Sequence, residues 1–246
     1  MTQQVNYLHS WFNTYRGDDM CGRFTIAVNK EDVKEHLYQQ FGIEDFDIDF
    51  FLPRYNIAPG EKIIAVISDG KSYRAGLMRW GFVPHFSGAY QMINAKRETI
   101  QEKSAFKNAF YNRRCLLLAD GYYEWKKEGN RKIPYRITIK DRNLIAFAGI
   151  WNYGSIDGNR VVTCAIITGA AGPNMSWLHE RVPVILKPDA EKIWLNPEST
   201  DPKLLYNLTE PLPDSEYRLY PVSSLVNNSR NDVIECIKPL QNKNER

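Results

Sequence analysis

RCLLLADGYYEWKKEGNRKIPYRITI, residues 114–139, contains three apolar and aromatic runs separated by turn residues. The runs Arg114–Ala119, Tyr122–Lys126 and Pro134–Ile139 have the length and the branched or aromatic side chains typical of β-strands. Glu128-Gly129-Asn130 provides a short turn between the second run and the third. Because strands joined by such short turns pair antiparallel, this stretch predicts an antiparallel sheet.

Similar runs recur along the rest of the chain. Lys62–Ser68 and Ser72–Trp80 flank Asp69-Gly70, the pattern of a β-hairpin, whereas Arg54–Gly60 is rich in turn residues. Further strands are expected at Cys21–Val28, Ile145–Trp151, Val161–Thr168, Val182–Leu186 and Tyr217–Val222. Helices are expected at Lys30–Phe41, Ser104–Tyr111, Pro188–Leu195 and Pro202–Leu208. Many closely spaced strands with few flanking helices predict an α+β fold, a single compact domain whose antiparallel sheets curl into a barrel-like core.

The composition excludes several classes of protein. No apolar run among the 246 residues is long enough to span a bilayer, so we expect a cytoplasmic monomer with no membrane partner. The net charge of +3 is only mildly basic, so any nucleic-acid site must come from local clustering of cations. The four cysteines lie far apart and form no Cys-x-x-Cys pair, which predicts reduced thiols, no metal site and no cofactor.

Met20-Cys21-Gly22-Arg23-Phe24 places a cysteine directly after a methionine. If Cys21 becomes the N-terminal residue, it offers an α-amine with a pKa near 7.7–8.0 beside its thiol, against about 10.4 for a lysine amine. Such an amine can form an imine with an aldehyde, and the thiol can then close a five-membered thiazolidine ring. The Met-Cys pair alone equally fits a buried cysteine at the start of a strand.

Residues 1–19 precede this cysteine and lack the basic start and continuous apolar core of a secretory signal. Two interpretations remain: translation begins at Met20, or the segment is a propeptide that masks the amine. We therefore expect an N-terminal extension over 1–19 that is absent from the mature protein, a catalytic domain over 20–240, and a polar tail over 241–246.

Three further segments combine polar groups that could carry chemistry. The segment 93–99 holds an amide and two cations, 120–125 places Glu124 among aromatics, and 177–183 contains His179 in a charged setting. Apolar surroundings raise the pKa of a carboxyl group towards that of a useful general acid or base. Taken singly, Asn94 fits a turn, Glu124 a solvent-facing strand position and His179 a loop support.

Six motifs in this order resemble the SOS-response-associated peptidase family, and the resemblance runs from Cys21 to about Ile237. They are MCGRF at 20–24, RYNIAPG at 54–60, WGFVP at 80–84, INAK at 93–96, ADGYYEW at 119–125 and HERVP at 179–183. Members of that family sense abasic sites in single-stranded DNA and trap them covalently. The open form of an abasic deoxyribose exposes an aldehyde, which is the electrophile that an aminothiol requires.

The resemblance implies a role for each matching residue. Cys21 would be the nucleophile, Asn94 would position the amine and the sugar, Glu124 would move protons, and His179 would help to open the deoxyribose ring. It also implies a DNA path in which cations hold phosphates and Trp80 stacks on a base beside the lesion. Its residues would be Arg23, Pro59, Trp80, Lys96, Thr168 and Arg181. The alternatives are a solvated charged face for the cations and a core position for Trp80.

Two features depart from the family pattern. Lys96 stands where the family commonly has arginine, and a lysine binds a phosphate as a point charge but cannot fork across two oxygens. The stretch 1–19 is incompatible with a free Cys21 amine unless it is removed or never made.

Two other function classes stay open at this point. N-terminal-nucleophile amidotransferases also begin Met-Cys-Gly, although Arg23 follows here at once and the chain has no Asn-Gly pair for an oxyanion segment. A non-catalytic single-strand nucleic-acid module would use the aromatic and basic residues alone, and would bind intact strands as well as abasic ones.

Overall fold

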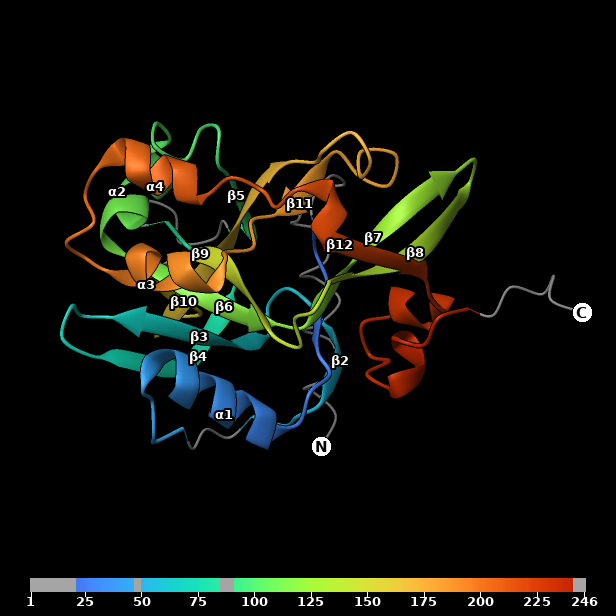
Figure 1. The fold of residues 1–246 in the computed structure, drawn as a ribbon, viewed down its shortest axis with the longest axis horizontal. Helices are drawn as coiled ribbons and strands as arrows, with labels where there is room; N and C mark the ends of the chain where they lie inside the picture. The colour runs from blue at the N-terminus through green and yellow to red at the C-terminus, as the bar shows by residue number, and fades with distance from the viewer. Residues whose placement is uncertain (1–20, 47–49, 85–90, 241–246) are drawn as a thin grey trace, which may run out of the picture.

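The computed structural model describes residues 21–46, 50–84 and 91–240, which form two β-sheets with helices packed around them (Figure 1). The α+β class and the single compact domain with a barrel-like core are confirmed. The expected extension over 1–19 and the tail over 241–246 lie outside the described residues.

The larger sheet closes into a barrel. Its strands follow the order β10-β4-β3-β6-β9, and pairing of β9 with β10 closes the ring. They are β3 (Lys62–Ser68), β4 (Tyr73–Trp80), β6 (Arg114–Ala119), β9 (Ile145–Ile156) and β10 (Asn159–Ala170). β10 runs parallel to β4, so the barrel is mixed, whereas the sequence predicted antiparallel pairing. The short strands β5 (Asn94–Lys96) and β11 (Arg181–Pro183) attach to β10.

The second sheet is antiparallel throughout. Its order is β12 (Tyr217–Pro221), β8 (Arg131–Ile139), β7 (Gly121–Glu128), β1 (Phe24–Ile26) and β2 (Arg54–Ile57). β2 falls in the segment from which the sequence predicted turns, because four residues carry too little alternation to identify a strand.

Asp120-Gly121 is the point at which the chain passes from the barrel strand β6 to the second sheet. Asp120 accepts hydrogen bonds from Thr25 and from Arg136, the latter at 2.9 Å, and so ties β1 and β8 to this corner. A Cβ on Gly121 would lie 2.9 Å from the backbone oxygen of Ile137, so only glycine permits the close approach of β7 and β8. This corner fixes the position of the strand that carries Glu124.

Four helices accompany the sheets within the described residues. They are α1 (Lys30–Phe41), α2 (Ser104–Asn112), α3 (Pro188–Leu195) and α4 (Pro202–Leu208). The side chain of Asn29 accepts from the backbone N–H of Asp32, and Gly42 ends α1 in the left-handed conformation, as the sequence predicted. None of these helices is long and apolar enough to cross a membrane.

An aromatic cluster joins the two sheets. Phe24 of β1 contacts Trp80 of β4 with ring centroids 5.1 Å apart and Phe147 of β9 at 5.7 Å. All three side chains are fully buried. Truncation of such a residue typically costs about 3–5 kcal/mol, so this cluster strongly stabilises the contact between barrel and sheet beside Cys21.

Candidate active site around Cys21

Cys21 lies three residues before β1, where the second sheet meets the barrel, and it is completely buried. Its backbone carbonyl accepts a hydrogen bond of 2.9 Å from the side-chain amide of Asn94. Asn94 comes from β5, which is held in register by Ile166 of the barrel strand β10. Two segments 73 residues apart therefore meet at the cysteine.

Glu124 comes from β7 of the second sheet. Its strand β7 pairs with β1, where Tyr122 lies opposite Phe24. The side chain is 4% exposed, so the solvent-facing position considered from the sequence is wrong. Burial raises the pKa of Glu124 well above its usual value. Burial, and next the charge of Glu124, likewise raise the pKa of the Cys21 thiol, so the surroundings favour the protonated form of both groups.

Buried polar atoms without partners gather around the cysteine. Within the described part of the chain, no hydrogen bond satisfies Asn94 Oδ1, Glu124 Oε1 or the hydroxyl of Tyr122. The pKa of Tyr122 is raised first by burial, then by the charges of Tyr217, Cys21 and Glu124, which places its hydroxyl in the same electrostatic neighbourhood. Since buried polar groups are nearly always hydrogen-bonded, these three unpaired atoms near Cys21 are available to a ligand.

His179 lies on the segment between β10 and β11. The backbone N–H of Arg181 donates to its Nδ1 at 3.0 Å, and the Arg181 carbonyl oxygen lies 3.1 Å from the same nitrogen. Nδ1 is therefore occupied in either protonation state, which leaves Nε2 to act on a substrate. Among the described residues no hydrogen bond joins His179 to Cys21, Asn94 or Glu124.

Three of the residues predicted to bind DNA come together beside this segment. Lys96 of β5 is exposed and lies opposite Thr168 of β10. Arg181 donates from Nη2 to the backbone oxygen of Thr168 at 2.6 Å and to its hydroxyl at 3.1 Å. The Glu98 carboxylate accepts hydrogen bonds from both terminal nitrogens of the Arg181 guanidinium, at 2.8 and 3.0 Å. This carboxylate orients Arg181 and partly neutralises it.

Arg23, Pro59 and Trp80, the other predicted DNA contacts, have different surroundings. Arg23 is buried and donates to Asn56 and to the backbone oxygen of Val226, both at 2.8 Å, and Pro59 is half-buried. Trp80 is fully buried and donates from its indole to the Ile93 carbonyl at 2.9 Å. Its ring presents no face on which a base can stack, so the alternative of a core tryptophan describes its place here.

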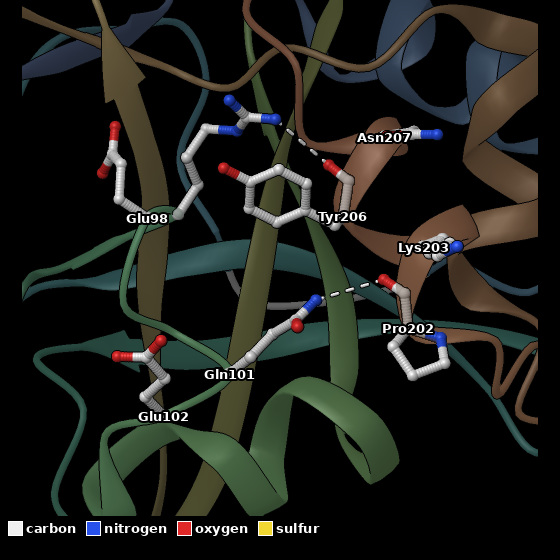
Figure 2. Close-up of a pocket in the computed structure, with 8 residues that line it drawn as sticks. Glu98, Gln101, Glu102, Pro202, Lys203, Tyr206 and Asn207 are labelled. Carbon is white, nitrogen blue, oxygen red and sulfur yellow. Dashed lines mark hydrogen bonds between the residues drawn. The ribbon is translucent and has the colours of Figure 1, made fainter.

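A pocket of about 380 Å³ lies between the segment after β5 and helix α4 (Figure 2). Figure 2 shows Gln101 donating to the Pro202 carbonyl, and Arg97 donates from Nη2 to the Tyr206 carbonyl at 3.3 Å. Arg97 also forms an ion pair with Glu210 and lies over the ring of Tyr206, so its guanidinium already has an anionic partner within the protein. The four predicted catalytic residues are not among the residues that line this pocket.

Sequence reasoning assigned no role to Tyr122 or Trp177, although both lie in segments that it singled out. Tyr122 stands two residues before Glu124, and strand alternation could have placed both on one face. The exposure of Trp177 depends on tertiary packing and leaves no local signal. Within 21–46, 50–84 and 91–240 there is no group of three or more histidine, cysteine or acidic side chains able to hold a metal ion.

A family model matches most of the chain. The model for the SOS response associated peptidases (SRAP) matches residues 20–229, a range that contains every residue described above around Cys21. The chain belongs to the SRAP family. The match begins at Met20, so the SRAP region leaves out the stretch 1–19.

Several SRAP relatives resemble the chain over most of its length. The abasic site processing protein YoqW of Bacillus subtilis is 41% identical over 231 residues, which cover 89% of this chain and 99% of YoqW. YedK of Escherichia coli, also named an abasic site processing protein, is 30% identical over 227 residues, covering 90% of this chain and all of YedK. HMCES of Xenopus tropicalis is 29% identical over 90% of this chain and 78% of its own.

Solved structures share the fold. A protein from Bacteroides thetaiotaomicron superposes with a TM-score of 0.76 at 23% identity, covering 89% of this chain and all of its own. A phage-related protein from Bordetella bronchiseptica reaches a TM-score of 0.66 at 30% identity, covering 82% of this chain and 94% of its own.

Proposed function

We propose that this protein processes abasic sites in single-stranded DNA by forming a covalent thiazolidine link through Cys21 as its N-terminal residue. The observation that carries the proposal is the trio of buried, unpaired polar atoms of Asn94, Glu124 and Tyr122 around Cys21. The names of the relatives YoqW, YedK and HMCES supply the substrate class.

The first step joins the α-amine to the sugar. The neutral nitrogen attacks C1′ of the open deoxyribose, and one amine proton passes to the carbonyl oxygen to give a carbinolamine. Burial raises the pKa of Glu124 and so favours its protonated form, which can protonate that hydroxyl group. Water leaves, an iminium ion remains, and Glu124 is left as a carboxylate.

The second step closes the ring. The Cys21 thiol gives its proton to the Glu124 carboxylate, and the sulfur attacks C1′ of the iminium ion to form the C–S bond. The charge of Glu124 acts on this thiol, in keeping with a short path for that proton. Glu124 ends the cycle protonated as it began, and the net reaction is condensation of amine, thiol and aldehyde with loss of one water.

His179 would act before these steps, when the sugar is still a closed hemiacetal. Opening breaks the bond between C1′ and O4′, O4′ gains a proton from His179 Nε2, and the C1′ hydroxyl loses its proton to solvent. The Arg181 backbone holds Nδ1 and so fixes the ring for this transfer. Asn94 would keep the Cys21 backbone in place for attack by its amine.

Lys96 and Arg181 would hold the phosphates that flank the lesion. Both belong to the edge formed by β5, β10 and β11, and the Glu98 carboxylate keeps the Arg181 guanidinium in one orientation. Binding through such contacts weakens as salt rises, because each phosphate contact releases a counterion. We propose that the protein acts as a monomer at the nucleoid, where single-stranded DNA occurs.

A denaturing gel tests the proposal. Protein beginning at Cys21 is incubated with a single strand that carries one abasic site, and we expect a shifted band that survives denaturation. Cys21→Ser should form only an imine that borohydride traps, and Cys21→Ala should at best do the same. A stable band of wild-type yield from Cys21→Ala would exclude the thiazolidine.

Two control assays separate the other function classes. An amidotransferase would release ammonia from glutamine and leave the gel unchanged, so glutamine hydrolysis is measured on the same sample. A non-catalytic module would bind intact and abasic strands equally, with no band that survives denaturation.

A further inference from the structure

Trp177 is a half-exposed tryptophan at the edge of the candidate site. It lies two residues before His179, and 50% of the residue is exposed. The segment that carries it, between β10 and β11, lies beside the β7–β8 hairpin (Figure 1). The protein buries only half of this indole, so a ligand bound at the rim of the site can cover the apolar surface that is still exposed.

The contacts of Trp177 hold its ring in one orientation. Its indole N–H donates to the Asn174 carbonyl at 2.9 Å, within its own segment. Tyr135 of β8 packs edge-on against it, with ring centroids 5.4 Å apart and an angle of 84°. The ammonium group of Lys126 lies 5.5 Å from the centre of the indole. The ring is therefore fixed before any ligand arrives.

Strand register relates this ring to Glu124. Side chains two residues apart in a strand share a face, so Tyr122, Glu124 and Lys126 form one row along β7. Exposure rises along the row, from two buried residues to a Lys126 side chain that is 32% exposed. Tyr135 lies directly opposite Glu124 on β8. Trp177 contacts both Tyr135 and Lys126. It therefore lies over the solvent-side end of this row, next to Glu124.

We infer that Trp177 is the stacking platform for the nucleotide next to the abasic site, with Lys126 neutralising the phosphate of that nucleotide. This inference takes its occupant, single-stranded DNA, from the proposed function. An aromatic face beside a cation matches the two parts of a nucleotide, a planar base and an anionic phosphate. Trp80 cannot serve this purpose because its ring is enclosed in the core.

Lys126 is available for this contact. Its partner is Glu128, two residues along the same strand, in an ion pair whose members are 32% and 47% exposed. Exposed pairs of this kind contribute little, since solvent screens both charges. A DNA phosphate can therefore take the place of the Glu128 carboxylate.

Fluorescence anisotropy with a labelled, intact single strand tests the platform without any covalent step. Trp177→Ala should raise the dissociation constant about 5- to 150-fold, the range expected for loss of one stacked base. Trp177→Phe keeps an aromatic face and should recover most of the affinity. Tyr38→Ala is the matched control, because Tyr38 is also 50% exposed but lies on α1, away from β7 and β8, and it should bind like wild type.

A second variant tests the cation independently of the ring. Lys126→Gln should reduce the slope of log affinity against log salt by about one, as expected for one lost phosphate contact. Binding of Trp177→Ala within twofold of wild type, or an unchanged salt slope for Lys126→Gln, would overturn the inference. The covalent assay on an abasic strand is run in parallel. Absence of a cross-link from wild type would refute the proposed function. Normal cross-linking by wild type, together with unchanged DNA binding by Trp177→Ala, would refute only the stacking role of Trp177.

Discussion

Glu124 is the residue whose chemistry depends most on its burial. The fold places a carboxyl group 4% exposed beside a thiol and leaves Oε1 without a hydrogen bond among the described residues. General acids and bases typically contribute about 10²–10⁴-fold in rate. We expect Glu124→Gln to slow single-turnover cross-linking by an amount in that range, while Glu35→Gln, an exposed change on α1, leaves it unchanged. An unaltered rate in Glu124→Gln would remove this residue from the mechanism.

His179 should affect a different step, and the choice of substrate reveals it. His179→Ala should slow cross-linking of abasic DNA at the lower end of the same range, because the hemiacetal ring must open first. Condensation with a simple aldehyde that has no ring, such as propanal, should proceed at the wild-type rate. Mass spectrometry of both adducts measures the two rates. If the variant slowed both reactions equally, His179 would act on the amine or the thiol rather than on the ring.

At the scale of elements, a buried carboxyl group couples two helices. Glu191 of α3 is 3% exposed and accepts a hydrogen bond of 2.9 Å from Gln40 of α1. Burial, as the largest cause, raises the pKa of Glu191 to about 7 from a usual value of 4.5. The folded state thus binds a proton that the unfolded state has lost, and the free energy of unfolding falls as pH rises from 4.5 through 7. Each unit of pKa corresponds to about 1.4 kcal/mol, so the loss reaches about 3 kcal/mol.

Glu191→Gln removes this titration and should keep the hydrogen bond within reach. Urea unfolding at pH 5 and pH 8 should show a smaller loss of stability for the variant than for wild type. The difference between the two proteins cancels the titrating groups that do not interact with Glu191. Equal pH dependence in both would mean that the Glu191 carboxyl is as well solvated in the folded state as in the unfolded one.

The same scale shows which elements could be predicted from sequence. Lys30–Phe41 and Pro188–Leu195 were predicted with the observed bounds, because cap residues and an N-terminal proline mark their ends. The strand expected over Cys21–Val28 spans only Phe24–Ile26. β2 and β5 were missed because three or four residues show no period, and the parallel pairing of β10 with β4 joins strands far apart in sequence. Such pairing depends on the closure of the barrel rather than on local pattern.

The candidate site likewise depends on the whole molecule. Asn94 reaches Cys21 from β5, the short strand attached to the barrel, and Glu124 comes from the second sheet. Sequence motifs identified these residues through a family resemblance, but their burial and the unpaired atoms follow only from the packing of barrel against sheet. The opposite positions of Trp80 and Trp177, one enclosed and one exposed, have the same origin.

Chain maturation is the last property of the whole molecule that the mechanism requires. A nitrogen acylated by Met20 is an amide with no basic lone pair, so it cannot attack an aldehyde. We expect the active protein to begin at Cys21, either because translation starts at Met20 and the methionine is removed, or because the chain cuts the Met20–Cys21 bond itself. In self-cleavage the Cys21 thiol attacks the Met20 carbonyl carbon and gives its proton to Glu124. The C–N bond then breaks as Glu124 passes a proton to the departing amine, and water hydrolyses the resulting thioester to a Met20 carboxyl group and the free Cys21 thiol.

Intact-mass analysis of protein expressed from the full 246-residue frame measures the outcome. Two variants separate the routes: Met20→Ala blocks a start at residue 20 but leaves self-cleavage possible, and Cys21→Ala blocks self-cleavage but leaves the start intact. Loss of the 1–20 segment from Met20→Ala but not from Cys21→Ala would identify autoproteolysis, and the converse would identify the internal start. A cross-linking species that retains residues 1–20 would contradict the free-amine mechanism, because only the thiol or a lysine would then be left to react with the aldehyde.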